Sequence, residues 1–227
     1  MRFKDVFSII GPSMVGPSSS HTAGAVRIGL AARQALGEPP LEADIFLYGS
    51  FAETYRGHGT DLALIAGLLG YSTDDERIPD AYRQAELAGL QVRIQAEKRP
   101  EAHPNTAALS LRGRTERIRA KGRSIGGGNV EIVGIDRFDV KFAAAQPTLL
   151  VFHADRSGMV AEVSGVLTRA QVNISHMQVD RESRNGAALT VVECDQLPGG
   201  AALGEIGRIA GVGKVRLIDL AAKEGIG

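Results

Sequence analysis

The chain has 227 residues, 44% of them hydrophobic, and its 26 basic side chains balance 26 acidic ones. This composition is typical of a folded globular protein, and the length allows one large domain or two small ones. Because the net charge is zero and only 5% of the residues are aromatic, we expect no binding to nucleic acid and no attraction to a membrane.

The first half of the chain predicts an α+β domain. A helix is expected at 20–36, where Gly37 and two prolines stop it. The spacing of apolar residues predicts further helices at 60–70 and 79–89. Strands are expected at 43–48, 90–96, 107–111, 116–124 and 130–135.

An alanine-rich segment closed by a proline, 141–147, predicts a linker between two domains, at 1–143 and 147–227. The second domain predicts strands and helices in the order β-α-β-β-α-β, which is the ferredoxin-like split βαβ arrangement. Its expected elements are a strand at 148–153, a helix at 157–170, strands at 174–181 and 187–193, a helix at 203–210 and a strand at 214–220.

No apolar run approaches the roughly 20 residues that span a bilayer, and residues 1–5 do not resemble a signal peptide, so we expect a cytoplasmic protein. The single cysteine, Cys194, cannot form an internal disulfide and is expected to be a buried thiol. One cysteine cannot hold a structural zinc ion or an iron–sulfur cluster, which need about four ligands. We therefore expect no metal site in this chain, and any metal chemistry must come from another chain.

Three serines precede the first expected helix and are followed by a histidine and a threonine, as Ser18, Ser19, Ser20, His21 and Thr22. Their hydroxyls, the unpaired backbone N–H groups and the positive end of the helix dipole would together suit a carboxylate or a phosphate. The alternative is that the serines only cap the helix.

A second histidine stands before another expected helix, in Gly57-His58-Gly59-Thr60-Asp61. A histidine at a helix start has its charged form disfavoured by the dipole, so its pKa should tend downward. Such an imidazole is neutral at pH 7 and can act as a general base. One histidine of this kind is usually structural, and spacing alone does not show whether the two histidines meet.

Two further clusters contain polar groups or glycines in turns. His103 and Asn105 belong to a rigid turn that offers donors and acceptors, and Gly126 and Gly127 lie in a glycine run between two strands. The glycines predict either a flexible hairpin or a nest of N–H groups for an anion. The run lacks the lysine of a nucleotide-binding loop and does not begin a helix, which argues against nucleotide binding.

Four basic residues alternate along one expected strand and project from one face of it: Arg117, Arg119, Lys121 and Arg123. Such a face could bind an anion or a nucleic acid. Because no aromatic residues are interleaved and the chain has no net basic charge, a solvated or subunit-contacting face is favoured.

The loop at 155–161, followed by a helix that ends before Val172-Asn173-Ile174, resembles the ACT domain, a small amino-acid-sensing module. The resemblance implies an effector site, usually between two such domains, at Asp155, Gly158, Asn173 and Ile174. Alternatively, Gly158 only permits the turn, Asn173 only caps the helix, and the domain serves dimerisation. In either case we expect it to self-associate through a strand edge or a helix face.

The motifs of the whole chain resemble the β subunit of iron–sulfur-dependent L-serine dehydratase. The segments that carry this resemblance lie at 7–12, 16–24, 48–52, 57–61, 103–106 and 124–128, followed by the ACT-like half. The first domain is also similar to an allosteric substrate-binding domain found in a serine-pathway dehydrogenase. The family enzyme converts L-serine to pyruvate and ammonia, and its α chain supplies the cysteines that hold a [4Fe–4S] cluster.

By this resemblance His21 and His58 are the catalytic candidates, in an active site that an α chain completes. A neutral base would take the α-proton of serine, and a Lewis-acid iron would assist the departure of hydroxide. The resemblance further implies that L-serine is bound by Ser18, Ser19, Ser20, Thr22, Gly59, Thr60, Asp61, His103, Asn105, Gly126 and Gly127. Two alternatives stay open: a non-catalytic regulatory subunit that binds serine as an effector, and a free-standing amino-acid sensor.

Overall fold

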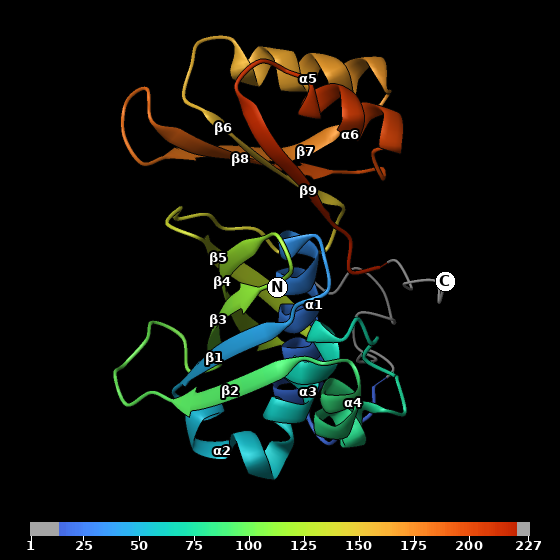
Figure 1. The fold of residues 1–227 in the computed structure, drawn as a ribbon, viewed down its shortest axis with the longest axis vertical. Coiled ribbons are helices and arrows are strands. Elements are labelled where there is room, and N and C mark those ends of the chain that lie inside the picture. The colour runs from blue at the N-terminus through green and yellow to red at the C-terminus, as the bar shows by residue number, and fades with distance from the viewer. Residues whose placement is uncertain (1–13, 222–227) are drawn as a thin grey trace.

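The computed structural model describes residues 14–221. The motif expected at 7–12 therefore lies outside the described residues. The part that is described contains two β-sheets, one in each half of the chain, with helices packed on each (Figure 1). This is the α+β class predicted from the sequence.

The first sheet has five strands in the order β2-β1-β3-β4-β5. Only the β1–β2 pair is parallel, and the other neighbours are antiparallel. The strands are β1 (Glu42–Tyr48), β2 (Gln91–Ala96), β3 (Thr106–Arg112), β4 (Arg117–Gly126) and β5 (Asn129–Ile135). All five lie within two residues of the predicted ranges, because each carries a clear apolar pattern.

The helices of the first domain pack against one face of this sheet and leave the opposite face open (Figure 1). Alternate residues of the strands, such as Ile45 and Leu109, are buried under the helices. A π-helical turn, Ser19–Ala23, leads directly into the first α-helix. The helices are α1 (Gly24–Leu36), α2 (Ser50–His58), α3 (Thr60–Leu68) and α4 (Ala81–Leu87), the last preceded by a 3₁₀ turn, Ile78–Asp80.

Helix α2 was not predicted from the sequence. Phe51 is its one fully buried residue, so it carries no apolar stripe from which a helix could be recognised. Glycines bound it on both sides, Gly49 with φ 53° and Gly59 with φ 67°. These left-handed conformations separate α2 from β1 and from α3, and glycine adopts them without steric cost.

The second domain has the predicted β-α-β-β-α-β order, so the ferredoxin-like expectation is confirmed. Its sheet has the strand order β7-β8-β6-β9, and helices α5 and α6 cover one face (Figure 1). The elements are β6 (Thr148–Ala154), α5 (Met159–Arg169), β7 (Ile174–Arg181), β8 (Ala187–Cys194), α6 (Gly200–Gly207) and β9 (Val212–Ile218).

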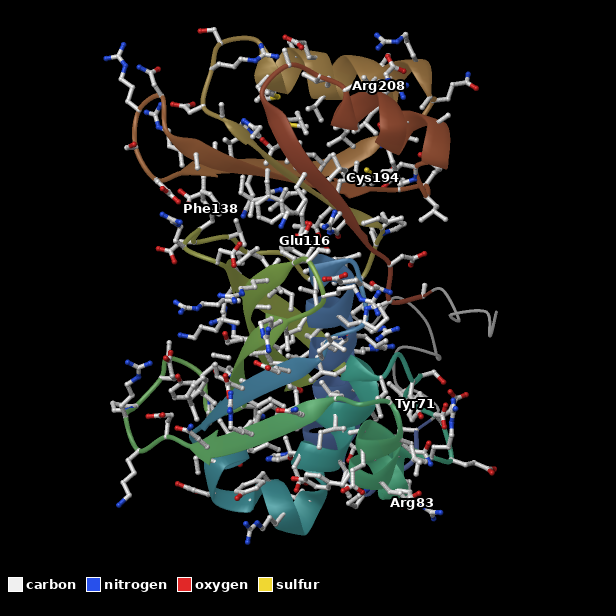
Figure 2. All side chains as sticks on the ribbon, in the orientation of Figure 1. Tyr71, Arg83, Glu116, Phe138, Cys194 and Arg208 are labelled. Carbon is white, nitrogen blue, oxygen red and sulfur yellow. The ribbon has the colours of Figure 1, made fainter. Side chains whose placement is uncertain are left out.

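The other face of the second sheet packs on the first domain. On β6, Leu149 and Val151 face the helices, whereas Leu150 belongs to the core of the first domain, and Phe152 packs against that core. Phe138 lies at this seam, with its ring centroid 6.4 Å from that of Phe152 (Figure 2). The two halves therefore share a continuous apolar core.

The segment at 141–147, predicted as the linker between the two domains, connects β5 to β6 and is packed against the first sheet. The N–H and C=O of Phe142 bond to those of Ile132 at 3.1 and 2.9 Å, and the side chains of Phe142 and Ala144 are buried. Alanines and a proline mark a break in regular structure, but a chain reversal over an apolar surface has the same composition.

Among residues 14–221, no helix is long and apolar enough to cross a membrane.

Candidate functional site

The structure brings His21 and His58 together. Their ring centroids lie 4.8 Å apart and the ring planes are 69° from one another. His21 belongs to the π-helical turn before α1, and His58 is the last residue of α2. The two residues are 37 positions apart in the sequence, so only the packing of α2 against the π-helical turn could place them in contact.

Hydroxyl groups lie next to both ring nitrogens of His21. Its Nε2 forms a hydrogen bond of 3.1 Å with Oγ of Ser50, and its Nδ1 lies 3.4 Å from Oγ of Ser18. Phe51 packs edge-on against the same ring, at a centroid distance of 5.3 Å. Partial burial lowers the pKa of His21, and repulsion by His58 lowers it further. The direction is the expected one, and burial is its main cause.

The sequence placed His58 just before a helix, and α3 does begin two residues later, at Thr60, but a further helix precedes the histidine. It ends α2, and the left-handed Gly59 separates it from the start of α3. The dipole argument therefore does not apply to His58. Its side chain is exposed and forms no hydrogen bond with any residue of 14–221. His21, in contrast, is half-buried and has a serine hydroxyl beside each ring nitrogen.

The serine turn contains one capping residue and two residues with free hydroxyls. Oγ of Ser18 accepts a hydrogen bond from the backbone N–H of His21 at 3.1 Å, which is the cap. Ser19 and Ser20 are half-buried, and their hydroxyls bond to no other described residue. Thr22 is buried and its hydroxyl also lacks a partner within 14–221.

The turn that holds His103 and Asn105 is held against the start of α2 and against β4. The backbone N–H of Phe51 donates to the Pro104 carbonyl at 3.3 Å, and that of Ser124 donates to the Asn105 carbonyl at 2.9 Å. Nδ1 of His103 accepts from the backbone N–H of Asn105 at 3.2 Å. Some of the hydrogen-bonding groups of this turn are therefore already paired within the turn itself.

Two residues near the histidines were missed as site candidates, Ser50 and Ser124. Ser124 is buried, its hydroxyl has no described partner, and a Cβ atom added to Gly24 would lie 2.2 Å from its Oγ. Both serines stood in motifs singled out from the sequence, at 48–52 and 124–128. The sequence around Ser50 and Ser124 showed only that they lay in loops. The residues they contact, His21 and Gly24, are distant in the chain, so no local pattern could reveal these contacts.

Gly59, Thr60 and Asp61 join α2, α3 and α4. The carboxylate of Asp61 is buried, and it accepts hydrogen bonds from the Tyr82 hydroxyl at 3.2 Å and from the Leu62 backbone N–H at 2.9 Å. Burial and the nearby Asp61 raise the pKa of Tyr82 to about 12. The hydroxyl of Thr60 is buried without a partner in the described chain. The observed contacts of Asp61 therefore hold α3 against α4.

The glycine run forms the hairpin between β4 and β5. Gly126, Gly127 and Gly128 have φ values of 97°, 61° and 77°, which account for three glycines in succession. The Gly128 carbonyl accepts a hydrogen bond of 2.8 Å from Arg27, which ties the hairpin to α1. The turn chemistry explains the run without an anion.

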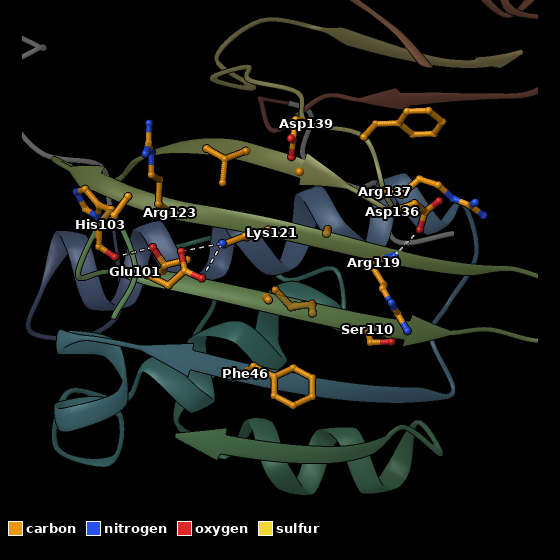
Figure 3. A pocket seen from close by; sticks show the side chains of 18 of the residues that line it. Phe46, Glu101, His103, Ser110, Arg119, Lys121, Arg123, Asp136, Arg137 and Asp139 are labelled. Atoms are coloured by element: carbon orange, nitrogen blue, oxygen red, sulfur yellow. Dashed lines mark hydrogen bonds and ion pairs between the residues drawn. The ribbon is translucent and has the colours of Figure 1, made fainter. Parts of the chain in front are cut away.

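The four basic residues of β4 lie on the open face of the sheet, and three of them, Arg119, Lys121 and Arg123, line a cavity of about 780 Å³ that His103 also borders (Figure 3). Lys121 forms an ion pair of 2.8 Å with Glu101, and Arg123 pairs with Glu131. Acidic side chains thus neutralise part of this row. The pairing is consistent with the solvated or subunit-contacting face expected from the sequence.

The four effector candidates lie at opposite ends of the second sheet. The carboxylate of Asp155 accepts from Arg181 and from the Asn185 N–H, both at 3.0 Å, and these bonds lower its pKa, the Asn185 bond most. Gly158 has φ 89° and precedes α5 at the same end.

Asn173 donates to Asp195 at 2.6 Å and does not cap α5, and Ile174 begins β7 beside Cys194. The length of β7 places this pair about 24 Å from Asp155 and Gly158. One chain therefore cannot form a small-molecule site from all four residues.

The described residues do not fit an iron–sulfur cluster. No group of three or more His, Cys, Asp or Glu side chains that could hold a metal ion occurs within 14–221. Cys194 is fully buried, and burial raises the pKa of its thiol to about 11. A thiol in this environment is not a thiolate ligand at neutral pH.

Comparisons with known proteins agree with the two-part organisation. Residues 3–91 match the family described as Serine dehydratase beta chain, and residues 147–211 match the ACT domain. The chain is 44% identical over 196 residues to the "Probable L-serine dehydratase, beta chain" of Bacillus subtilis (strain 168), covering 86% of this chain and 89% of that one.

Two further relatives are informative. The chain is 35% identical over 194 residues to the "L-serine dehydratase, beta chain" of Peptoniphilus asaccharolyticus, covering 84% of this chain and 86% of the relative. It is 23% identical over 195 residues to the "D-3-phosphoglycerate dehydrogenase" of Bacillus subtilis (strain 168), covering 37% of that protein. On the two high-identity matches over most of its length, the chain belongs to the family of L-serine dehydratase β chains and carries a C-terminal ACT domain.

Proposed function

We propose that this chain works with an α chain to convert L-serine to pyruvate and ammonia. The observation that carries the proposal is the pair of steeply inclined histidine rings, 4.8 Å apart, next to the serine turn at the start of α1. His58 is exposed there, so this chain offers part of a site that another chain can cover. The β-chain names of the relatives support an α partner.

His58 is the general base in this proposal. Both ring nitrogens of His21 face serine hydroxyls, whereas His58 has no hydrogen-bond partner among the residues described. A ring nitrogen of His58 takes the proton as the Cα–H bond of serine breaks. The neutral His21 packs against this ring and adds no positive charge beside it at pH 7.

The serine turn binds the substrate carboxylate. Ser19 and Ser20 have hydroxyls that bond to no other residue of 14–221, close to the first N–H groups of the continuous π and α helix, where a negative charge is stabilised. Thr22 and the turn at 103–106 border this region.

The [4Fe–4S] cluster implied by the family resemblance is assigned to cysteines of the α chain, and the enzyme is assigned to the cytoplasm.

The ACT domain is proposed to self-associate and to bind an effector between two copies. Asp155 and Gly158 of one copy would then face Asn173 and Ile174 of another, because these pairs lie at opposite ends of one sheet. Sedimentation velocity of the full chain measures this association, and a monomer at all concentrations contradicts it.

Alanine substitution in the assembled two-chain enzyme tests the catalytic role. His58→Ala should lower kcat by about 10²–10⁴, the usual loss for a general base, with a smaller change in KM for L-serine. His21→Ala should reduce kcat less. His176→Ala is the matched control, because His176 is an exposed histidine on β7, and its activity should equal that of the unmodified enzyme.

Near-normal kcat in both His58→Ala and His21→Ala, with the complex assembled, would show that this chain is not catalytic. The regulatory alternative, in which the first domain binds serine as an effector, would then account for the family membership.

A further inference from the structure

Ser50 contacts the histidine pair from a helix other than the one that carries His21. Its Oγ lies 3.1 Å from Nε2 of His21, whereas Oγ of Ser18 lies 3.4 Å from the other ring nitrogen, Nδ1. A ring bonded at one nitrogen alone can still swing about its side-chain torsions. With a serine hydroxyl beside each of its two nitrogens, the His21 ring is restrained in its rotation.

The helix that begins at Ser50 ends at His58. Its nine residues span about 12 Å, and side chains on a helix lean toward its N-terminus. His21 consequently touches both ends of α2, through the hydrogen bond to Ser50 and the ring contact with His58. Phe51, the buried residue beside Ser50, packs on the same imidazole. One short helix therefore sets the position of both histidine rings relative to each other.

The backbone of Ser50 is itself held in place. Gly49 precedes it with φ 53° and approaches Pro104 so closely that an added Cβ would lie 2.7 Å from the Pro104 backbone. The Phe51 N–H donates to the Pro104 carbonyl, and the Thr54 hydroxyl donates to the Ser50 carbonyl at 2.8 Å. The Ser50 hydroxyl thus projects from a rigid start of α2.

We infer that Ser50 is a positioning residue for the dehydration reaction: its hydroxyl holds the His21 imidazole at Nε2, and His21 in turn holds the ring of His58 in the orientation that receives the α-proton. The inference rests on the proposed function. Ser50 touches neither the substrate nor the reacting atoms in this role, and it acts through His21.

The test is Ser50→Ala in the assembled two-chain enzyme. Loss of one neutral hydrogen bond that orients a catalytic pair should lower kcat about tenfold, with KM for L-serine changed less than about twofold. Ser50→Thr retains the hydroxyl and should restore kcat to within about threefold of the unmodified enzyme. Thr168→Val is the matched control, because it removes a hydroxyl that makes the same kind of bond within a helix of the ACT domain, to the Ser164 carbonyl at 2.8 Å, and its kcat should equal that of the unmodified enzyme.

Unchanged kcat in Ser50→Ala overturns the inference, and so does an equal loss in Ser50→Ala and Ser50→Thr, which would indicate a packing role. A second measurement does not depend on activity. In the isolated full chain, the imidazole ¹⁵N chemical shifts of His21 should report a single tautomer, and Ser50→Ala should give a mixture of tautomers. Identical shifts in both proteins contradict the Ser50 contact even if the catalytic role of His58 has failed.

Discussion

A single close approach, between Gly24 and Ser124, determines where the turn that carries His21 can lie. A Cβ atom at position 24 would fall 2.2 Å from Oγ and 2.8 Å from Cβ of Ser124. In an unobstructed helix, replacing glycine by alanine is favourable by about 1 kcal/mol. Here we expect Gly24→Ala to lower the free energy of unfolding by about 1–3 kcal/mol, because the turn must move away from β4. Urea denaturation of the full chain measures this change.

The double variant Gly24→Ala/Ser124→Gly is the control for this prediction. It removes the obstructing side chain, so the two substitutions should be strongly coupled and the double variant should recover most of the loss. Additive effects would show that the contact with Ser124 is not the cause.

At the scale of elements, α1 and α3 approach one another through glycine. An added Cβ at Gly67 would lie 2.1 Å from the Val26 carbonyl oxygen, and one at Gly29 would lie 2.4 Å from the Leu64 carbonyl oxygen. Backbone atoms cannot yield as a flexible side chain can. Gly67→Ala should therefore cost about 3 kcal/mol of stability, measured by chemical denaturation.

Gly57→Ala in α2 is the matched control for Gly67→Ala. A Cβ atom added to Gly57 would have no neighbouring atom within 4 Å, so alanine there should stabilise the chain by about 0.5–1 kcal/mol through its better helix propensity. Similar effects of the two substitutions would mean that helix propensity, and not close packing, governs these positions.

At the scale of the molecule, α1 extends from the histidine site to the ACT domain. Its last residue, Leu36, accepts a hydrogen bond of 3.1 Å from Arg216 of β9. Gln34 and Asp219 exchange two hydrogen bonds, at 2.9 and 3.1 Å. The ACT domain is thus bonded to the C-terminal end of the helix whose N-terminal turn holds His21.

Glu116, which is labelled in Figure 2, forms ion pairs between the first domain and the ACT domain. It pairs with Lys214 at 2.6 Å and Arg216 at 2.9 Å, and the hydrogen bond from Lys214 is the main cause that lowers its pKa below the ordinary 4.5. A lowered folded pKa means that the stabilisation is complete above the unfolded pKa and is lost as the pH falls through the folded one.

Glu116→Gln should accordingly reduce the stability of the full chain by about 1 kcal/mol at pH 7, and the difference from the unmodified chain should vanish at strongly acidic pH. Denaturation at both pH values measures this. Glu205→Gln removes a more exposed ion pair with Arg169 inside the ACT domain and should change stability by less than about 0.5 kcal/mol. A Glu116→Gln effect that persists unchanged into acid contradicts the ion-pair explanation.

Local patterns in the sequence were sufficient to predict most of the fold. Strand β6 and helix α5 follow from apolar periodicity, and the hairpin between β7 and β8 was predicted from Asn185-Gly186, although the observed turn is centred one residue earlier, with the Gly186 N–H bonded to the Ser183 carbonyl. These patterns involve only residues a few positions apart, so they can be recognised without knowledge of the tertiary structure. The same reasoning failed for α2, whose one fully buried residue is Phe51. It also gave no sign that 141–147 packs on the first sheet, because that burial depends on the strands beneath it.

The chain's residue types also determined what the site could contain: histidines and hydroxyls beside helix ends, with one cysteine and hence no cluster of thiolates. Only the tertiary structure decided which of them meet. His21 is 29 residues from Ser50 and 37 from His58, and the contacts among them depend on how α2 packs against the turn before α1. Contacts between such distant residues arise from the packing of whole elements, for which no local pattern carries a signal.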